Sequence, residues 1–198
     1  MQKFDTPTPA PISAVLNIPA GRLQIIAADR ADTTVEIRPA NPANSRDTKT
    51  AEQTEITYTN GILRIHTPEP DNQFLGHPGS VEITIQLPAG SHIEAKTAAA
   101  EFRAVGRLGN ITFDGAHHHT KIDEAAGVRL TATDSDIEIG RLTGPTQITT
   151  ARGTIRITEA VAGTLDLRTQ SGDITVGAAT GTSATLDAST GYGRINNT

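Results

Sequence analysis

Three consecutive histidines, His117, His118 and His119, form the densest group of potential metal ligands in the sequence. Two aspartates, Asp134 and Asp136, follow about one sequence repeat later. Imidazole nitrogens and carboxylate oxygens both bind divalent transition metals, so these five side chains are a candidate metal site if neighbouring strands bring them together. The alternative is a solvated turn, which the lack of a His-Glu-x-x-His or similar spacing favours. We therefore predict no bound cofactor and keep these five residues as the metal candidates.

Four further acids are candidates for acid–base or glycosidic chemistry: Asp123, Glu138, Asp166 and Asp187. Paired carboxylates are the catalytic groups of most glycosidases. We expect cationic neighbours to neutralise the first two and Arg168 to neutralise Asp187. The chain has no tryptophan and only two tyrosines to stack on sugars, and it lacks Gly-x-Ser-x-Gly, phosphate-loop and dinucleotide motifs. The sequence favours a non-enzymatic scaffold or protein-interaction module; the alternative is a carbohydrate-active or metal-dependent enzyme built on a β-helix.

The elements that position these side chains belong to a repeat between residues 109 and 198. Each copy has an alternating apolar strand, a small polar turn and a second short strand. A fixed short period of strand and turn is typical of a β-solenoid, in which each copy is one rung stacked on the last. We predict an all-β, single-stranded β-helix, right-handed, with rungs of about 18 residues. Copies begin at Gly109, Gly127, Gly144, Gly163 and Gly181, at intervals of 18, 17, 19 and 18 residues.

Strict alternation in the rungs predicts which side chains face the interior. Successive side chains of a strand point to opposite faces, so every second residue of each short strand belongs to the core. The core positions are almost all aliphatic, which agrees with an aromatic content of 3%. The predicted core residues are Ile111, Phe113, Val128, Leu130, Ile148, Thr150, Leu165, Leu167, Ala184 and Leu186 in the first strand, and Ile122, Ile137, Ile139, Ile155, Ile157, Ile174, Val176 and Ile195 in the second.

Outward-facing charges alternate in sign from rung to rung. Arg103 is expected next to Asp123, and Glu138 next to Arg156. Neighbouring strands lie about 4.8 Å apart, and an opposite-charge pair across them contributes roughly 0.2–1 kcal/mol. Such pairs fix the register, because a slip by one residue would bury charge. We interpret most of these charges as structural.

The chain is predicted to form one continuous domain over residues 1–198. Residues 1–86 form irregular N-terminal strands with loops at 39–52 and 68–80, and residues 87–198 form the regular rungs. Asn60 and Gly61 form the strongest hairpin signal, between strands expected at 53–59 and 62–66. Helix signals are almost absent; residues 50–53 are expected to form a turn at most.

Composition limits the partners and the cellular location. The net charge is −5 with no basic block, so nucleic acid is excluded as a partner. No cysteine is present, so neither a disulfide nor a thiolate metal site can form. No stretch has the length and hydrophobicity of a signal peptide or a membrane span. We predict a cytoplasmic protein that does not interact with membranes.

Two of the turns carry a shared motif that resembles a known family. Thr150-Ala-Arg-Gly-Thr-Ile155 and Thr169-Gln-Ser-Gly-Asp-Ile174 both read Thr-x-x-Gly-x-Ile. The repeated strands with this motif resemble the bacterial domain of unknown function 4097, described as adhesin-like. The resemblance covers essentially the whole chain. The segment Ala-Val-Leu-Asn-Ile-Pro-Ala-Gly-Arg-Leu from Ala14 is similar to its actinobacterial cytoplasmic members. The resemblance implies a β-helix without an established activity, and it supplies no catalytic residues.

The final rung, residues 181–198, predicts a protein contact. Each rung offers unpaired backbone groups to the next, and an uncovered rung is an adhesive edge. The residues that could cover this rung are only Tyr192 and the segment from Ile195 to Thr198. We therefore predict end-to-end pairing through this rung, as a homodimer, and allow for an unidentified protein partner.

Overall fold

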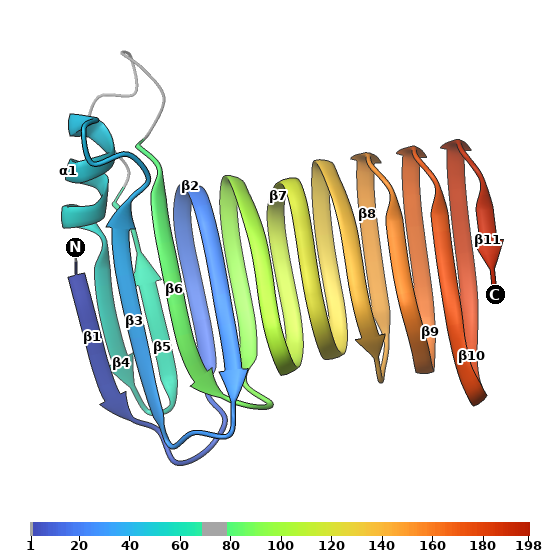
Figure 1. Ribbon diagram of the computed structural model, residues 1–198, viewed down its shortest axis with the longest axis horizontal. Helices are drawn as coiled ribbons and strands as arrows, with labels where there is room; N and C mark the ends of the chain where they lie inside the picture. The colour runs from blue at the N-terminus through green and yellow to red at the C-terminus, as the bar shows by residue number, and fades with distance from the viewer. Residues whose placement is uncertain (1, 69–78) are drawn as a thin grey trace.

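The structure is a computed structural model that describes residues 2–68 and 79–198, and most of these residues lie in β-strands. The described strands form one eleven-stranded sheet, which winds along the long axis of the molecule (Figure 1). A single short helix stands at the N-terminal end. The elements are β1 (Gln2–Pro7), β2 (Ser13–Ala28), β3 (Asp32–Pro39), α1 (Ser45–Gln53), β4 (Glu55–Thr59), β5 (Ile62–His66), β6 (Val81–Pro88), β7 (His92–Leu142), β8 (Thr146–Arg152), β9 (Ile155–Ser171), β10 (Ile174–Tyr192) and β11 (Ile195–Asn197).

The C-terminal half of the chain, from His92 onward, is a stack of parallel rungs. The long strands β7, β9 and β10 bend around the interior, and each successive turn lies beside the previous one (Figure 1). Val128 is the register partner of Thr146, which in turn pairs with Leu165 of the next rung. On the opposite side, Ile155 pairs in parallel with both Ile137 and Ile174. The predicted all-β, solenoid-like architecture is confirmed.

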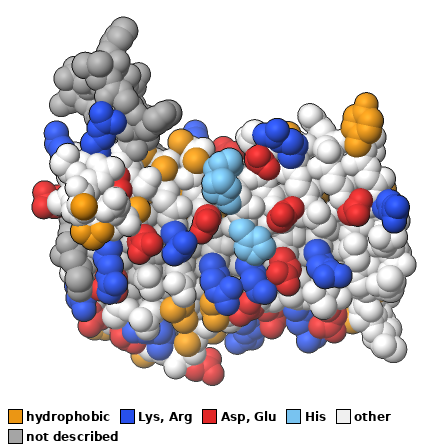
Figure 2. All heavy atoms as spheres, turned by 45° about the horizontal axis from the view of Figure 1, so that its top comes forward, with side chains coloured by type: hydrophobic (Ala, Val, Ile, Leu, Met, Phe, Trp, Pro, Cys, Tyr) orange, Lys and Arg blue, Asp and Glu red, His pale blue; other side chains and the backbone are white. Residues whose placement is uncertain are grey.

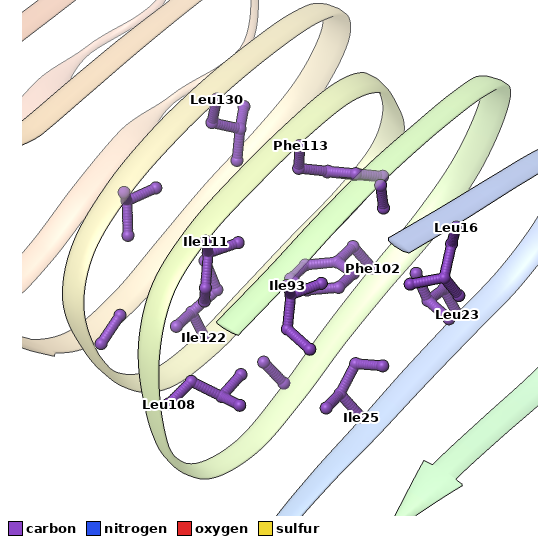
Figure 3. Close-up of a cluster of buried hydrophobic side chains, with 14 of the residues drawn as sticks. Leu16, Leu23, Ile25, Ile93, Phe102, Leu108, Ile111, Phe113, Ile122 and Leu130 are labelled. Carbon is purple, nitrogen blue, oxygen red and sulfur yellow. The ribbon is translucent and has the colours of Figure 1, made fainter. Parts of the chain in front are cut away.

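A continuous aliphatic core fills the interior of the stack. Figure 3 shows side chains from successive turns pointing toward one another, with Phe102 and Phe113 among them; these two rings lie with centroids 4.8 Å apart. The predicted core residues from Ile111 to Val176 are all buried. The prediction is wrong for the last rung, where Ala184 is exposed, Leu186 only half-buried and Ile195 45% exposed. No further rung of the described chain covers these side chains.

The Thr-x-x-Gly-x-Ile turns are stacked through their threonine hydroxyls. Thr169 Oγ1 donates to the carbonyl of Gly153 at 3.2 Å, and Thr190 Oγ1 donates to the carbonyl of Gly172 at 2.9 Å. Both bonds cross from one rung to the preceding one. These two hydroxyls therefore link the turns of successive rungs. Thr150 differs, because its hydroxyl donates to the carbonyl of Arg152 in its own turn at 2.8 Å.

The N-terminal part mixes antiparallel and parallel strands. The sheet order starts β1-β3-β6-β2, with β3 antiparallel to both of its neighbours and β6 parallel to β2. β4 and β5 form the predicted hairpin, and the positive φ angles of Asn60 (52°) and Gly61 (76°) are those of a type I′ turn. The hairpin prediction is confirmed.

The predicted loop at residues 39–52 is wrong, because α1 occupies its second half and continues to Gln53. The Asn44 side chain caps the helix by accepting from the N–H of Arg46 at 3.0 Å. Asp47 is buried and accepts from the N–H groups of Asn41 and Ser80. Tertiary bonds to one carboxylate, rather than an apolar stripe, thus hold the helix. The other predicted loop, 68–80, lies mostly outside the described residues. Within 2–68 and 79–198, no helix is long and apolar enough to cross a membrane.

Candidate functional site

The three histidines lie on the long strand β7, where the backbone is locally distorted. His118 has a φ of 64°, in the left-handed region that non-glycine residues rarely adopt. The kink brings the His117 and His118 rings together with centroids 3.9 Å apart. His118 and His119 are exposed, and His117 is half-buried. Figure 2 shows histidine side chains lying among acidic and basic ones on the outer surface.

The two candidate aspartates point toward the following rung instead. Asp134 Oδ2 accepts from Arg152 Nη2 at 3.1 Å, and Asp136 Oδ1 accepts from the N–H of Thr154 at 2.8 Å. Asp173, two rungs after Asp136, accepts from the N–H of Arg194 in the same way at 2.8 Å. An aspartate at this turn position therefore binds the backbone of the next rung.

The fold brings together only part of the predicted metal set. Two of the imidazoles stack on each other, while both carboxylates have partners on the far side of their own rung. Among the described residues, no group of three or more His, Asp or Glu side chains is placed to hold a metal ion. A local distortion such as the left-handed residue at His118 carries no sequence signal beyond the known tolerance of histidine for that conformation.

A shallow recess of about 330 Å³ lies beside His117 and His118. Its charged lining consists of Arg22, Glu82 and Glu101. Arg22 bridges the two carboxylates, with Nη1 3.5 Å from Glu82 and Nε 3.1 Å from Glu101. A general acid–base pair needs carboxylates free to take up and release protons at the substrate. Both carboxylates here are held in ion pairs with one guanidinium, which does not favour catalysis.

The four acids considered for catalysis are also engaged. Asp123 accepts from the N–H of Gly106 at 3.2 Å. Asp166 and Asp187 lie 2.8 and 3.7 Å from the guanidinium of Arg168, as the sequence predicts for Asp187. The hydrogen bond that Arg168 donates to Asp166 and the attraction of both carboxylates raise the pKa of Arg168, so this cation stays charged.

The outward-facing charges form ion pairs between neighbouring rungs, but the pairing differs from the predicted one. Glu138 and Arg156 are register partners, as expected, but the ion pair of Glu138 is with Lys121, at 3.3 Å. Both side chains of this pair are more than a third exposed. Figure 2 shows the two signs of charge interspersed over this face rather than gathered in one patch.

The C-terminal end of the stack has a different character. β10 pairs with β9 from Ser183 to Tyr192 with no register shift, and no described strand lies on the other side of that segment. The Tyr192 carbonyl accepts from the N–H of Gly172, so Tyr192 directs its backbone groups to β9. Backbone groups of alternate residues point to opposite neighbours along a strand. The residues that direct N–H and C=O to the open side are therefore Ser183, Thr185, Asp187, Ser189 and Gly191.

Apolar side chains accompany this open edge. Tyr192 is 82% exposed and Ile195 is 45% exposed, and they are the exposed large hydrophobic residues of the described chain. The structural equivalent of Ile195 one rung earlier is covered, because its register partner Ile174 is fully buried. The equivalent of Tyr192 is Ser171, which is exposed. We call residues 183–197 the C-terminal edge. It combines free ladder hydrogen-bonding groups with an uncovered section of the core.

Comparison with known proteins agrees with this description. The profile of the Toastrack DUF4097 family matches residues 16–198. The chain belongs to this family. Membership confirms the resemblance inferred from the Thr-x-x-Gly-x-Ile turns, while the actinobacterial subclass stays a prediction. No curated protein matches the Toastrack chain.

Solved structures resemble this chain at low identity. A candidate adhesin from Bacteroides fragilis NCTC 9343 is 12% identical with a TM-score of 0.50, and the alignment covers 100% of this chain and 96% of that one. At this identity the likeness shows the fold alone. Two proteins from Parabacteroides distasonis ATCC 8503 are each 11% identical over 100% of this chain and 96% of their own. One is a candidate adhesin with a TM-score of 0.45, the other a candidate lipid-binding protein with a TM-score of 0.34.

Proposed function

We propose that this Toastrack protein is a non-enzymatic interaction module that binds a protein partner by strand addition at its C-terminal edge. The observation that carries the proposal is the contrast between equivalent positions in successive rungs. Leu165 and Ile174 are buried, whereas their partners Leu186 and Ile195 are half-buried and 45% exposed. A strand added to an open edge gains main-chain hydrogen bonds and side-chain pockets together.

The energetic gain of such an addition can be estimated from the exposed core. Full burial of a large aliphatic side chain contributes about 1.5–3 kcal/mol, so covering the exposed half of Ile195 contributes about 1 kcal/mol. Leu186 and Ala188, which pack against the core from the edge, add to this. Each new ladder hydrogen bond contributes about 1 kcal/mol net. The edge therefore offers a favourable site for an extended segment.

The outer faces of the rungs are less suited to this role. Their charges are largely engaged within the chain, as in Arg141 with Glu159 at 3.4 Å and Arg152 with Asp134 at 3.1 Å. An exposed and internally paired surface offers little free energy to a partner, because exposed pairs contribute at most about 1 kcal/mol. The four acids considered for catalysis also support a non-enzymatic role, since each has a cationic or backbone partner.

A labelled peptide with the sequence of residues 163–176 tests the proposal, because it contains one complete strand–turn–strand rung. Fluorescence anisotropy is expected to show saturable binding to the protein. Ile195→Lys, which places a charge in the open core, should weaken binding about tenfold or more. Thr112→Lys is the matched control, since Thr112 is exposed on the outer face of β7, and it should bind as the parent does. Absent binding, or equal binding by the two lysine variants, would contradict the proposal.

Three finer points belong to the same proposal. The handedness and rung length are proposed as right-handed and about 18 residues, following the general crossover preference and the repeat period. The location is proposed as cytoplasmic and the subclass as actinobacterial, on the sequence similarity around Ala14 to Leu23. The non-binding of nucleic acid and membranes is proposed from the net charge of −5 without a basic block.

A further inference from the structure

We infer that the partner at the C-terminal edge is a second copy of this chain. The two copies are related by a two-fold axis that passes between Leu186 and the partner's Leu186. The inference rests on the proposed function, because it names the occupant of the same edge. Two identical edges that meet about a two-fold axis run antiparallel, and such a self-complementary contact closes after two subunits. The continuous ten-residue segment 183–192 of β10 provides the pairing surface.

Side-chain facing restricts where the axis can lie. Leu186 and Ala188 are half-buried and continue the core columns of Leu165 and Leu167, whereas Asp187 is exposed on the outer face. Core side chains of one subunit must meet core side chains of the other, since a slip by one residue would exchange the faces. The axis must therefore be level with a residue, so that this residue lies opposite its own copy in the partner. We call this arrangement an axis through that residue.

The charge and size of the facing side chains distinguish between the remaining positions of the axis. An axis through Asp187 sets two carboxylates directly opposite each other, which is destabilising. An axis through Ala188 sets Leu186 opposite the partner's Thr190, so the leucine side chain faces a polar residue instead of an apolar one. An axis through Leu186 sets Leu186 against the partner's Leu186, and it sets Asp187 opposite the partner's Thr185.

The backbone geometry fits this third arrangement. Thr185 and Asp187 direct their N–H and C=O groups to the open edge, so Thr185 and the partner's Asp187 form a hydrogen-bonded antiparallel pair. Leu186 and the partner's Leu186 then form a non-hydrogen-bonded pair, with Cα atoms about 4.5 Å apart and side chains in close contact. The ion pair of Asp187 with Arg168 lies within the subunit and is preserved.

Within residues 2–68 and 79–198, the opposite end of the molecule offers no edge of equal length for a head-to-tail contact. Its outer strands, β1 and β4, have six and five residues, and α1 stands at this end beside β3 (Figure 1). β1 and β4 also carry charged residues, including Lys3, Asp5 and Glu55. Among the described edges another C-terminal edge matches this one in length, so a closed dimer is favoured over a filament.

Single-cysteine cross-linking tests the register, because the chain contains no cysteine of its own. Leu186→Cys is expected to form a disulfide-linked dimer under mild oxidation, since its Cα–Cα distance of about 4.5 Å lies within the disulfide range. Ala188→Cys is the matched control two residues along the same face, and it should cross-link about tenfold more slowly or less. A mixture of Ala184→Cys and Ala188→Cys chains should cross-link, because these positions face each other across the axis.

Other outcomes overturn the inference in distinguishable ways. Faster cross-linking of Ala188→Cys or Asp187→Cys than of Leu186→Cys would place the axis elsewhere. Light scattering of the parent chain is expected to show a dimer that does not grow with concentration, and a series of larger species would indicate head-to-tail stacking. A monomeric parent that still binds the 163–176 peptide would exclude the second copy while the proposed function stands. A monomer that binds no peptide would contradict both.

Discussion

Gly172 lies in a stacked turn that leaves almost no room for a side chain, so Gly172→Ala should destabilise the fold strongly. Its φ of 146° lies in a region that residues with a Cβ avoid. A Cβ there would lie 2.1 Å from the carbonyl oxygen of Gly153 and 2.6 Å from its carbon. Both are backbone atoms of the preceding turn, so the whole turn must shift to relieve the contact.

The size of the effect follows from these contacts. The backbone strain costs about 1–3 kcal/mol, and displacement of the turn removes the hydrogen bond from Thr190 to Gly172, which contributes about 1 kcal/mol. We therefore expect a loss of about 2–4 kcal/mol. Gly61→Ala is the matched control: its φ is 76°, but a Cβ would meet nothing within 4 Å, so only the strain of about 1–2 kcal/mol applies.

Thermal unfolding followed by circular dichroism separates the two variants. For a domain of this size, 1 kcal/mol shifts the Tm by about 2–4 °C. The difference between the two losses is about 1–2 kcal/mol, so Gly172→Ala should melt about 2–8 °C below Gly61→Ala. Equal melting temperatures would mean that the turns do not stack as described, because the control also replaces a glycine with positive φ but creates no backbone contact.

Three further predictions concern charges and metals. Lys121→Glu places like charge beside Glu138 and should lower the unfolding free energy by about 0.5–1 kcal/mol. Adding Glu138→Lys should recover much of this loss. A double variant no more stable than the single one would show that the two residues are not coupled. Hydrogen bonds from Arg30 lower the pKa of Asp32, so the ionised form stabilises the fold at pH values above the ordinary pKa of about 3.9, and this stabilisation is lost as the pH falls through the lower folded value. The Tm advantage of the parent over Arg30→Gln should thus shrink in acid, and an advantage independent of pH would contradict the pairing. Micromolar zinc should leave the Tm of untagged protein unchanged; a shift that is abolished by replacing residues 117–119 with alanine would establish a metal site.

The repeat period and the alternation of apolar and polar residues predicted the rungs, because both signals are local in the sequence. The inward columns of Leu130, Ile155 and Leu167 repeat with each copy, and a side-chain period of two admits only one buried face. The Asn60-Gly61 turn was predictable for the same reason, since two adjacent residues with positive φ define it. Such features need no knowledge of distant contacts.

The features that the sequence missed depend on tertiary contacts. α1 is held by the buried carboxylate of Asp47, whose partner Ser80 lies 33 residues away. Glu138 has cations within reach on both neighbouring rungs, and side-chain geometry rather than register selects Lys121 over Arg156. The separation of the histidines from Asp136 likewise follows from the bond of Asp136 to the N–H of Thr154 in the next rung.

Amide hydrogen exchange along β10 tests the central claim, that the C-terminal edge is a docking surface, most directly. The amides of Leu186 and Ala188 point to β9 and should be protected at every protein concentration. Those of Thr185 and Asp187 point to the open edge; they should exchange rapidly in dilute protein and become protected as the concentration rises and the edge is covered. Rapid exchange of Thr185 and Asp187 at every concentration and with saturating 163–176 peptide would contradict the claim.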